Sequence, residues 1–147
     1  MEFVVTDARE DMLAQILEIE QKSFSVPWTE RMLRIQLEPG SYVFLAAVDG
    51  ARVLGYVGLM YVLDEGYISN VAVHPDCRRQ GVGSALLTAL ERRAREMALR
   101  FLTLEVRESN TGAAALYTGH GYRPVGRRKN YYDNPVEDAI LMTKELN

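Results

Sequence analysis

The chain of 147 residues has one cysteine and two histidines, which leaves little support for two classes of site. A lone Cys77 cannot form a disulfide within the chain, and this fits a reducing compartment such as the cytoplasm. A zinc site usually needs four Cys or His ligands, whereas His74 and His120 are scattered beside proline and glycine. We therefore expect a cytoplasmic protein without a metal site.

Long apolar runs and long basic runs are also missing. No apolar stretch approaches the ~20 residues of a membrane-spanning helix. Residues 1–7 lack the basic region and the cleavage site of a secretory signal. The net charge is −3, which disfavours general binding of nucleic acids. We expect neither a membrane nor a nucleic acid as partner.

What is present is typical of one globular domain over residues 1–147, with 48% hydrophobic and 25% charged residues. Asp7 with Glu10 predicts a capping box for a first helix, Thr29 a cap for a second, and Asp49-Gly50 a hairpin turn. The second helix should turn Met32, Leu33 and Leu37 inward. Apolar spacing predicts strands at 3–5, 42–48, 52–63, 66–73, 101–107, 122–130 and 138–145, and further helices at 82–97 and 111–118. The fold class is α/β (α+β), a mixed, mostly antiparallel sheet with about four helices and a local parallel strand–helix–strand unit around Gly81.

Residues 78–84 read Arg-Arg-Gln-Gly-Val-Gly-Ser, between a predicted strand and a predicted helix. A glycine-rich turn at a helix start presents unpaired N–H groups and the positive end of the helix dipole to an anion. Gly81 and Gly83 have no Cβ, so a phosphate could approach closely, and Arg78 and Arg79 add positive charge. The P-loop lysine is missing, and a dinucleotide loop needs three glycines. The bare motif is equally typical of a simple helix N-terminal turn.

The rest of the chain decides between these readings. The Arg-x-x-Gly-x-Gly spacing resembles the pyrophosphate-binding motif of the GCN5-related N-acetyltransferases, the GNAT family. The resemblance covers nearly the whole chain and narrows to the RimI group, the N-terminal alanine acetyltransferases of a small-subunit ribosomal protein. The other segments that carry it are Val26–Trp28, Leu104–Asn110, Ala115–Tyr117, Gly121-Tyr122, Asn130–Tyr132 and Glu137–Ile140. Gly121-Tyr122 departs from the family's usual Gly-Phe.

The resemblance implies the GNAT fold and acetyl-CoA as co-substrate. It implies that one strand splays from its neighbour so that the pantetheine pairs with its backbone, and that the following loop holds the pyrophosphate. The cofactor-binding residues so implied are Val71, Ala72, Val73, Arg78, Arg79, Gln80, Gly81, Val82, Gly83, Ser84 and Asn110. Asn110 is also a good N-cap for the next helix.

The resemblance also implies two catalytic residues. Glu105 would be the general base; its alternative is a structural salt bridge with Arg107 or another cation. Strand alternation puts Glu105 on the face opposite the flanking leucines. Tyr117 would protonate the CoA thiolate; its alternative is a core aromatic. Trp28 and Tyr131 are candidates for the acceptor groove, with ordinary packing equally open.

The expected activity is transfer of the acetyl group of acetyl-CoA to a protein's N-terminal α-amine. The resemblance implies the N-terminal alanine of small-subunit ribosomal protein eighteen as acceptor. A broader N-terminal or small-amine acetyltransferase is the first alternative. A non-catalytic acetyl-CoA-binding module is the second, although both Glu105 and Tyr117 are present.

Overall fold

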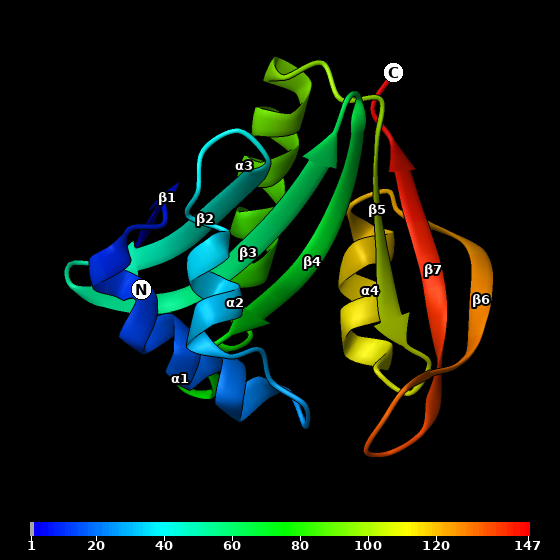
Figure 1. The fold of residues 1–147 in the computed structure, drawn as a ribbon, viewed down its shortest axis with the longest axis horizontal. Helices are drawn as coiled ribbons and strands as arrows, with labels where there is room; N and C mark the ends of the chain where they lie inside the picture. Colours follow the sequence, from blue (N-terminus) through cyan, green and yellow to red (C-terminus); the bar gives the residue numbers. More distant parts are fainter. Residues whose placement is uncertain (1) are drawn as a thin grey trace.

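The strands of this protein lie in one sheet with the order β1-β2-β3-β4-β5-β7-β6 (Figure 1). The computed structural model describes residues 2–147. The elements are β1 (Val4–Asp7), a 3-10 turn (Glu10–Met12), α1 (Leu13–Ser23), α2 (Glu30–Ile35), β2 (Tyr42–Asp49), β3 (Arg52–Val62), β4 (Glu65–Val73), a second 3-10 turn (Pro75–Cys77), α3 (Val82–Glu96), β5 (Phe101–Arg107), α4 (Thr111–Gly119), β6 (Arg123–Tyr132) and β7 (Glu137–Glu145). The predicted fold class is confirmed.

The sheet divides between β4 and β5, its one parallel pair. These strands pair only at Glu65 with Phe101, Gly66 with Leu102 and Tyr67 with Thr103, and then diverge, as Figure 1 shows. Beyond Tyr67 the β5-facing edge of β4 has no strand partner among residues 2–147. The parallel unit around Gly81 is therefore confirmed, and so is the splay.

A β-bulge lies on β4 just after the last of these pairs. Ser69 has no partner on β3, because Leu59 pairs with Ile68 and Gly58 pairs with Asn70. An extra residue in one strand increases its twist and redirects the side chains that follow it. The bulge thus accompanies the departure of β4 from β5.

Helices cover both faces of the sheet and create two apolar clusters. α3 packs on β2, β3 and β4 through a buried stripe that includes Val82, Leu86, Leu90 and Ala94, as its spacing predicts. α4 joins this layer, since Tyr117 packs in the same cluster. α1 packs against β3 and β4 in the second cluster, on the opposite face. Figure 1 shows α1 and α2 in front of the sheet and α3 behind it.

Of the two helix caps predicted near the N-terminus, the structure contains the second but not the first. The capping box is wrong: Asp7 still belongs to β1 and forms an ion pair with Arg93 at 3.1 Å, and the 3-10 turn before α1 has no side-chain cap. The Thr29 cap is confirmed, because its hydroxyl accepts a hydrogen bond from the Met32 N–H at 3.3 Å. The Met32 side chain is exposed rather than buried, while Leu33 is fully buried. The Asp49-Gly50 hairpin joins β2 to β3 as expected.

α3, with 15 residues, is the longest helix in the described chain. None of the helices in residues 2–147 combines the length and the apolar character that crossing a membrane requires. The same residues contain no cluster of three or more His, Cys, Asp or Glu side chains that could hold a metal ion.

Candidate active site

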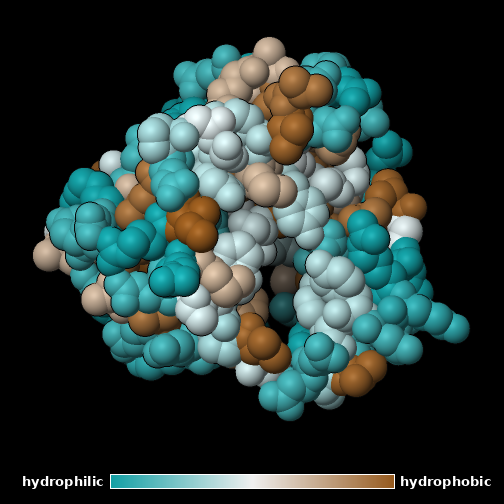
Figure 2. Space-filling model, in the orientation of Figure 1, coloured by the Kyte–Doolittle hydropathy of each residue, from teal (hydrophilic) through white to brown (hydrophobic). Residues whose placement is uncertain are grey.

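A cavity of about 560 Å³ lies where β4 leaves β5. Figure 2 shows the molecule hollowed between the half that carries α1 to β4 and the half that carries α4 to β7. The cavity is lined by β4, the glycine-rich loop, the start of α3, α4 and the end of α1. The predicted cofactor-binding residues on its wall are Val71, Ala72, Val73, Arg78, Arg79, Gly81, Val82, Gly83, Ser84 and Asn110. Gln80 is exposed and does not line the cavity.

The N-terminus of α3 supplies this cavity with an anion-binding end. Gly81 is the N-cap and has no side chain to accept a hydrogen bond from the first turn. The free N–H groups of that turn and the helix dipole together favour a negative charge. Arg78 folds back, and its Nε–H donates to the Val73 carbonyl at 3.3 Å. The cavity therefore suits a phosphate-bearing ligand at this end.

The two glycines of the loop serve different purposes. Gly81 has φ +82°, and a Cβ there would meet no atom within 4 Å. A Cβ on Gly83 would instead lie 3.2 Å from Leu116 Cδ2 and 3.7 Å from Val73 Cγ2. Gly81 provides a left-handed turn that opens on the cavity, whereas Gly83 lets α4 pack closely on α3. Close approach of a phosphate thus explains Gly81 better than Gly83.

α4 carries one predicted site residue at each end. Asn110 is its N-cap, as predicted, because Oδ1 accepts a hydrogen bond from the Ala113 N–H at 3.2 Å. Its amide group remains for other partners. Tyr117 lines the cavity and is 8% exposed, with its ring edge-on to Tyr122 at 5.9 Å. Burial raises the pKa of Tyr117 to about 12, so its hydroxyl keeps its proton at neutral pH.

Glu105 lies at the other side of the split. The Tyr67 hydroxyl is 2.6 Å from Glu105 Oε1 and 2.5 Å from Oε2, and donates to this carboxylate. Only 4% of the Glu105 side chain is exposed, and Arg128 Nε is 3.9 Å from Oε1. The alternative expected for Glu105, a salt bridge with Arg107 or another cation, is met by Arg128 and not by Arg107, which pairs with Glu137 at 3.2 Å. Tyr67 is the last residue of β4 that pairs with β5. Its hydrogen bond to Glu105 therefore extends the contact between these two strands past their last backbone pair.

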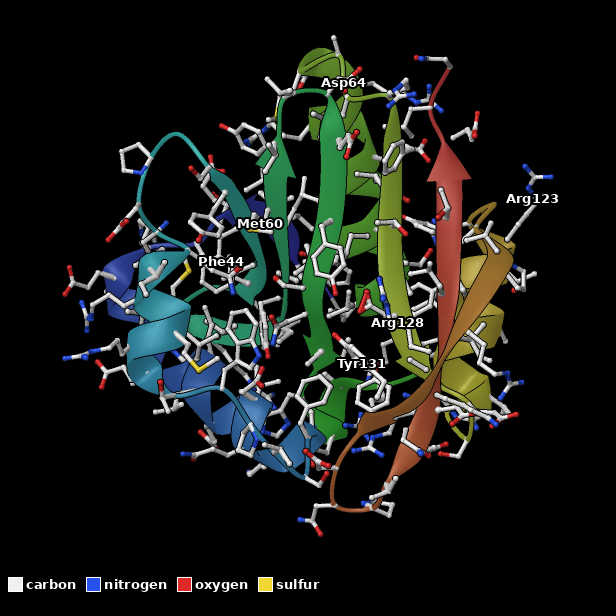
Figure 3. All side chains as sticks on the ribbon, turned by 45° about the vertical axis from the view of Figure 1, so that its right-hand side comes forward. Phe44, Met60, Asp64, Arg123, Arg128 and Tyr131 are labelled. Atoms are coloured by element: carbon white, nitrogen blue, oxygen red, sulfur yellow. The ribbon has the colours of Figure 1, made fainter. Side chains whose placement is uncertain are left out.

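Glu105 and Tyr117 come from opposite faces of the sheet. Leu104 and Val106, the neighbours of Glu105 on β5, are buried in the cluster that contains α3 and Tyr117. Strand alternation therefore turns Glu105 the other way. Figure 3 shows Arg128 in front of β5 and Tyr131 in front of the opening between β4 and β5, both on this second side and both from β6. A ligand in the cavity would have to reach through the split to meet Glu105.

The two candidates for the acceptor groove belong to different halves. Tyr131 on β6 is 47% exposed and packs edge-on against Tyr132 at 5.0 Å. Trp28 is half-buried beside the second cluster, and its backbone N–H donates to Glu20 Oε2 at 2.9 Å. Glu20 is buried and also accepts hydrogen bonds from Tyr56 and Asn70, which fixes the loop between α1 and α2 against the sheet.

Sequence reasoning missed Tyr67, Phe24 and Arg128. Tyr67 could have been found from the parallel pairing, because it pairs with Thr103, two residues from Glu105 on the same face. Phe24 lines the cavity from the end of α1. Arg128 lies on β6, 23 residues after Glu105 in the sequence, and its side chain reaches the Glu105 carboxylate. No local pattern marks these two residues.

Comparison with known proteins decides the family. A model of the acetyltransferase (GNAT) family matches residues 13–122. This chain belongs to the GNAT family. The prediction of an acetyl-CoA-dependent N-acetyltransferase is confirmed at this level.

Two curated relatives of this GNAT chain are [ribosomal protein bS18]-alanine N-acetyltransferases. The one from Escherichia coli K12 is 36% identical over 126 residues, which are 84% of each chain. The one from Haemophilus ducreyi is 34% identical over 135 residues, 90% of this chain and 92% of its own. These names agree with the group that the sequence resembles.

Solved structures agree in fold. The ribosomal-protein-S18-alanine N-acetyltransferase from Escherichia coli has a TM-score of 0.92 and 31% identity, covering 99% of this chain and 95% of its own. NAA60 from Arabidopsis thaliana, solved with acetyl-CoA, has a TM-score of 0.91 and 20% identity, covering 99% of both chains. At that identity the second likeness supports the fold alone.

Proposed function

We propose that this protein transfers the acetyl group of acetyl-CoA to the N-terminal α-amine of a protein, with the alanine of ribosomal protein bS18 as acceptor. The observation that carries the proposal is the split between β4 and β5, which joins a phosphate-suited cavity to a buried carboxylate. Family membership and the names of the relatives support the same activity.

The residues around the cavity fit acetyl-CoA as a substrate. The diphosphate would bind the N-terminus of α3 beside Gly81, Ser84 and the two arginines. The pantetheine would run along the unpaired edge of β4 at Val71–Val73, whose backbone can pair with its amides. A backbone N–H of this edge would then also stabilise the oxyanion of the tetrahedral intermediate. Asn110 has a free amide group on the opposite wall.

The acceptor amine would enter from the other face, where Glu105 lies. Glu105 would take the proton of the ammonium group, directly or through a water, so that the amine can attack the thioester carbonyl. The Tyr67 hydroxyl orients this carboxylate and stabilises its charge. Tyr117, which keeps its proton, would donate to the departing thiolate from the cavity side.

An α-amine suits this arrangement better than a lysine side chain. The α-amine has a pKa of ~7.7–8.0 against ~10.4 for lysine, so much less free energy is needed to deprotonate it. A single carboxylate can accept that proton near neutral pH. The alanine preference rests on the relatives' names rather than on this difference.

The experiment compares three peptides based on the N-terminal sequence of bS18. One has a free N-terminal alanine, one is N-acetylated and contains an internal lysine, and one begins with a bulky residue. We expect acetylation of the first peptide, located by mass spectrometry at the α-amine. Acetylation of the lysine, or equal rates with any N-terminal residue, would contradict the α-amine or the alanine proposal respectively.

A further inference from the structure

Arg107, the last residue of β5, contacts residues of both halves of the molecule although it lies outside the cavity. It follows Glu105 by two residues, so its side chain leaves the same face of the strand. Its guanidinium donates to the Asp133 carbonyl at 2.7 Å, the Pro135 carbonyl at 3.0 Å and Glu137 Oε1 at 3.2 Å. Asp133 and Pro135 belong to the turn between β6 and β7, and Glu137 is the first residue of β7.

The same guanidinium reaches across the split. Its Nη2 is 3.4 Å from the hydroxyl of Ser25, which lies in the loop between α1 and α2. That loop belongs to the half built on β1 to β4, whereas Arg107 belongs to the half built on β5 to β7. The guanidinium also lies over the ring of Tyr132, 4.5 Å from its centroid. One side chain thus joins two loops at the open end of the split.

Both loops carry apolar side chains that the fold leaves exposed. Phe24 and Val26 are 38% and 61% exposed in the first loop, and Val136 is 65% exposed in the second. Trp28 lies in the first loop, and Tyr131 on β6 lies beside Arg128, the cation next to Glu105. Exposed apolar side chains on two facing loops suit the side chains of an extended peptide.

We propose that Arg107 is a positioning residue that holds these two loops together as the walls of the acceptor groove. This inference rests on the proposed function, because it assigns the groove to the peptide acceptor. The role requires arginine. Its planar guanidinium presents five donors in a fixed fork and stacks on an aromatic ring, whereas lysine offers a point charge on a flexible stem.

A merely structural role for Arg107 makes a different prediction. If Arg107 only stabilised the β6–β7 hairpin, its loss would lower the thermal midpoint and leave the kinetics of the folded fraction unchanged. If it sets the groove, the KM for the peptide rises, because the loops must be ordered when the peptide binds. The affinity for acetyl-CoA should change less than the peptide KM does, because Arg107 does not line the cavity and, of the loop residues, only Phe24 does.

The experiment uses Arg107→Lys, Ser25→Ala and the control Arg127→Lys in the full chain. Arg127 is an exposed arginine of β6 whose ion pairs, with Glu108 at 2.9 Å and Asp138 at 3.0 Å, lie outside both loops. Steady-state kinetics with an alanine peptide give kcat and KM. Hydrogen exchange measures the opening of residues 24–28 and 133–136.

We expect Arg107→Lys to raise the peptide KM roughly 10-fold or more and to speed exchange in both loops. Ser25→Ala should raise KM a few-fold, and Arg127→Lys should match the parent. An unchanged peptide KM and unchanged exchange in Arg107→Lys would overturn the inference. If Arg107→Lys does not fold, an unchanged KM in Ser25→Ala would overturn it instead.

The parent enzyme separates the two proposals. A parent that acetylates no N-terminal peptide refutes the proposed function. Hydrogen exchange in Arg107→Lys then still decides whether this arginine holds the two loops together. A parent that is active together with an Arg107→Lys variant that behaves identically refutes only the inference about Arg107.

Discussion

The two sides of the split between β4 and β5 are built in different ways. On the α3 side, the cavity is made largely by consecutive residues: a strand edge, a glycine loop and a helix start between residues 71 and 84. On the other side, Glu105 is surrounded by Tyr67 and Arg128, which come from two other strands. The first side offers mostly backbone groups, and the second offers mostly side chains.

This difference explains how each side can recognise its ligand. Backbone N–H groups at a helix start suit a ligand whose charge and backbone-like amides are constant, as in acetyl-CoA. Side chains gathered from several strands can instead be exchanged without altering the fold, so this side can be adapted to a particular acceptor. The acceptor side should therefore control the choice of substrate and the removal of its proton, and the α3 side, apart from Tyr117, should control affinity for the co-substrate.

The largest expected effect comes from removing the carboxylate on the acceptor side. Glu105→Gln keeps the shape of the side chain but cannot take a proton, so kcat should fall roughly 10²–10⁴-fold near neutral pH. The loss should shrink as pH rises, because more of the amine is then already neutral. Calorimetry should find acetyl-CoA affinity nearly unchanged. Normal turnover at pH 7 would contradict the role of Glu105.

Tyr117→Phe tests the one side chain on the α3 side to which we assign chemistry. The ring stays in its packing with Tyr122, and only the hydroxyl is lost. If that hydroxyl protonates the thiolate, kcat should fall roughly 10–10³-fold, with little change in acetyl-CoA affinity. Rate and affinity measured on the same preparation separate this from a packing role, in which neither would change.

Tyr117 should also affect stability at alkaline pH. Its pKa is raised by burial from the ordinary 10.0 to about 12, so the folded state holds the proton more tightly than the unfolded state. This contribution is complete below about pH 10 and is lost as pH rises toward 12, amounting to roughly 2–3 kcal/mol. Between these pH values the parent should lose more stability in urea titrations than Tyr117→Phe does. Parallel losses would show that the hydroxyl is not buried.

Tyr67→Phe tests the hydrogen bond that spans the split. Without the hydroxyl, Glu105 loses a donor to both of its carboxylate oxygens and is held less firmly, so kcat should fall roughly tenfold. Acetyl-CoA affinity should stay the same, because Tyr67 does not line the cavity. A variant with parental kcat would mean that the position of Glu105 does not depend on Tyr67.

How much could be predicted from the sequence follows the same division. The strand, loop and helix around Gly81 and the cap at Asn110 are local patterns, and the structure has them as predicted. The partners of Glu105 depend on strand order and register, which a single sequence does not specify. Sequence neighbourhood offers Arg107 as one possible salt-bridge partner of Glu105, but the Arg107 side chain meets Asp133 and Glu137 at the end of the strand, and Arg128 from β6 is the cation beside Glu105.

The failed capping box at Asp7 has a similar cause. Asp and Glu three residues apart are typical of a helix start, yet Asp7 is the last residue of β1, which pairs with β2. Tertiary pairing with Leu45 and the ion pair with Arg93 decide the outcome, and both partners are distant in sequence. A local motif is therefore reliable here where its own residues complete the interaction, as at Thr29.

The smallest expected effect comes from a matched pair of glycines on the α3 side. Gly81→Ala places a Cβ at φ +82° and into open space on the cavity wall, which should cost about 1–2 kcal/mol of stability and weaken acetyl-CoA binding. Gly83→Ala keeps an allowed backbone but presses on Leu116 at 3.2 Å, so it should loosen α4 on α3 and leave the backbone N–H groups in place.

Thermal midpoints with and without acetyl-CoA distinguish the two variants, because ligand stabilisation reports affinity for the folded state. Gly81→Ala should reduce the shift that acetyl-CoA produces, and Gly83→Ala should lower the midpoint while keeping that shift. The reverse result would assign the approach of the phosphate to Gly83 after all.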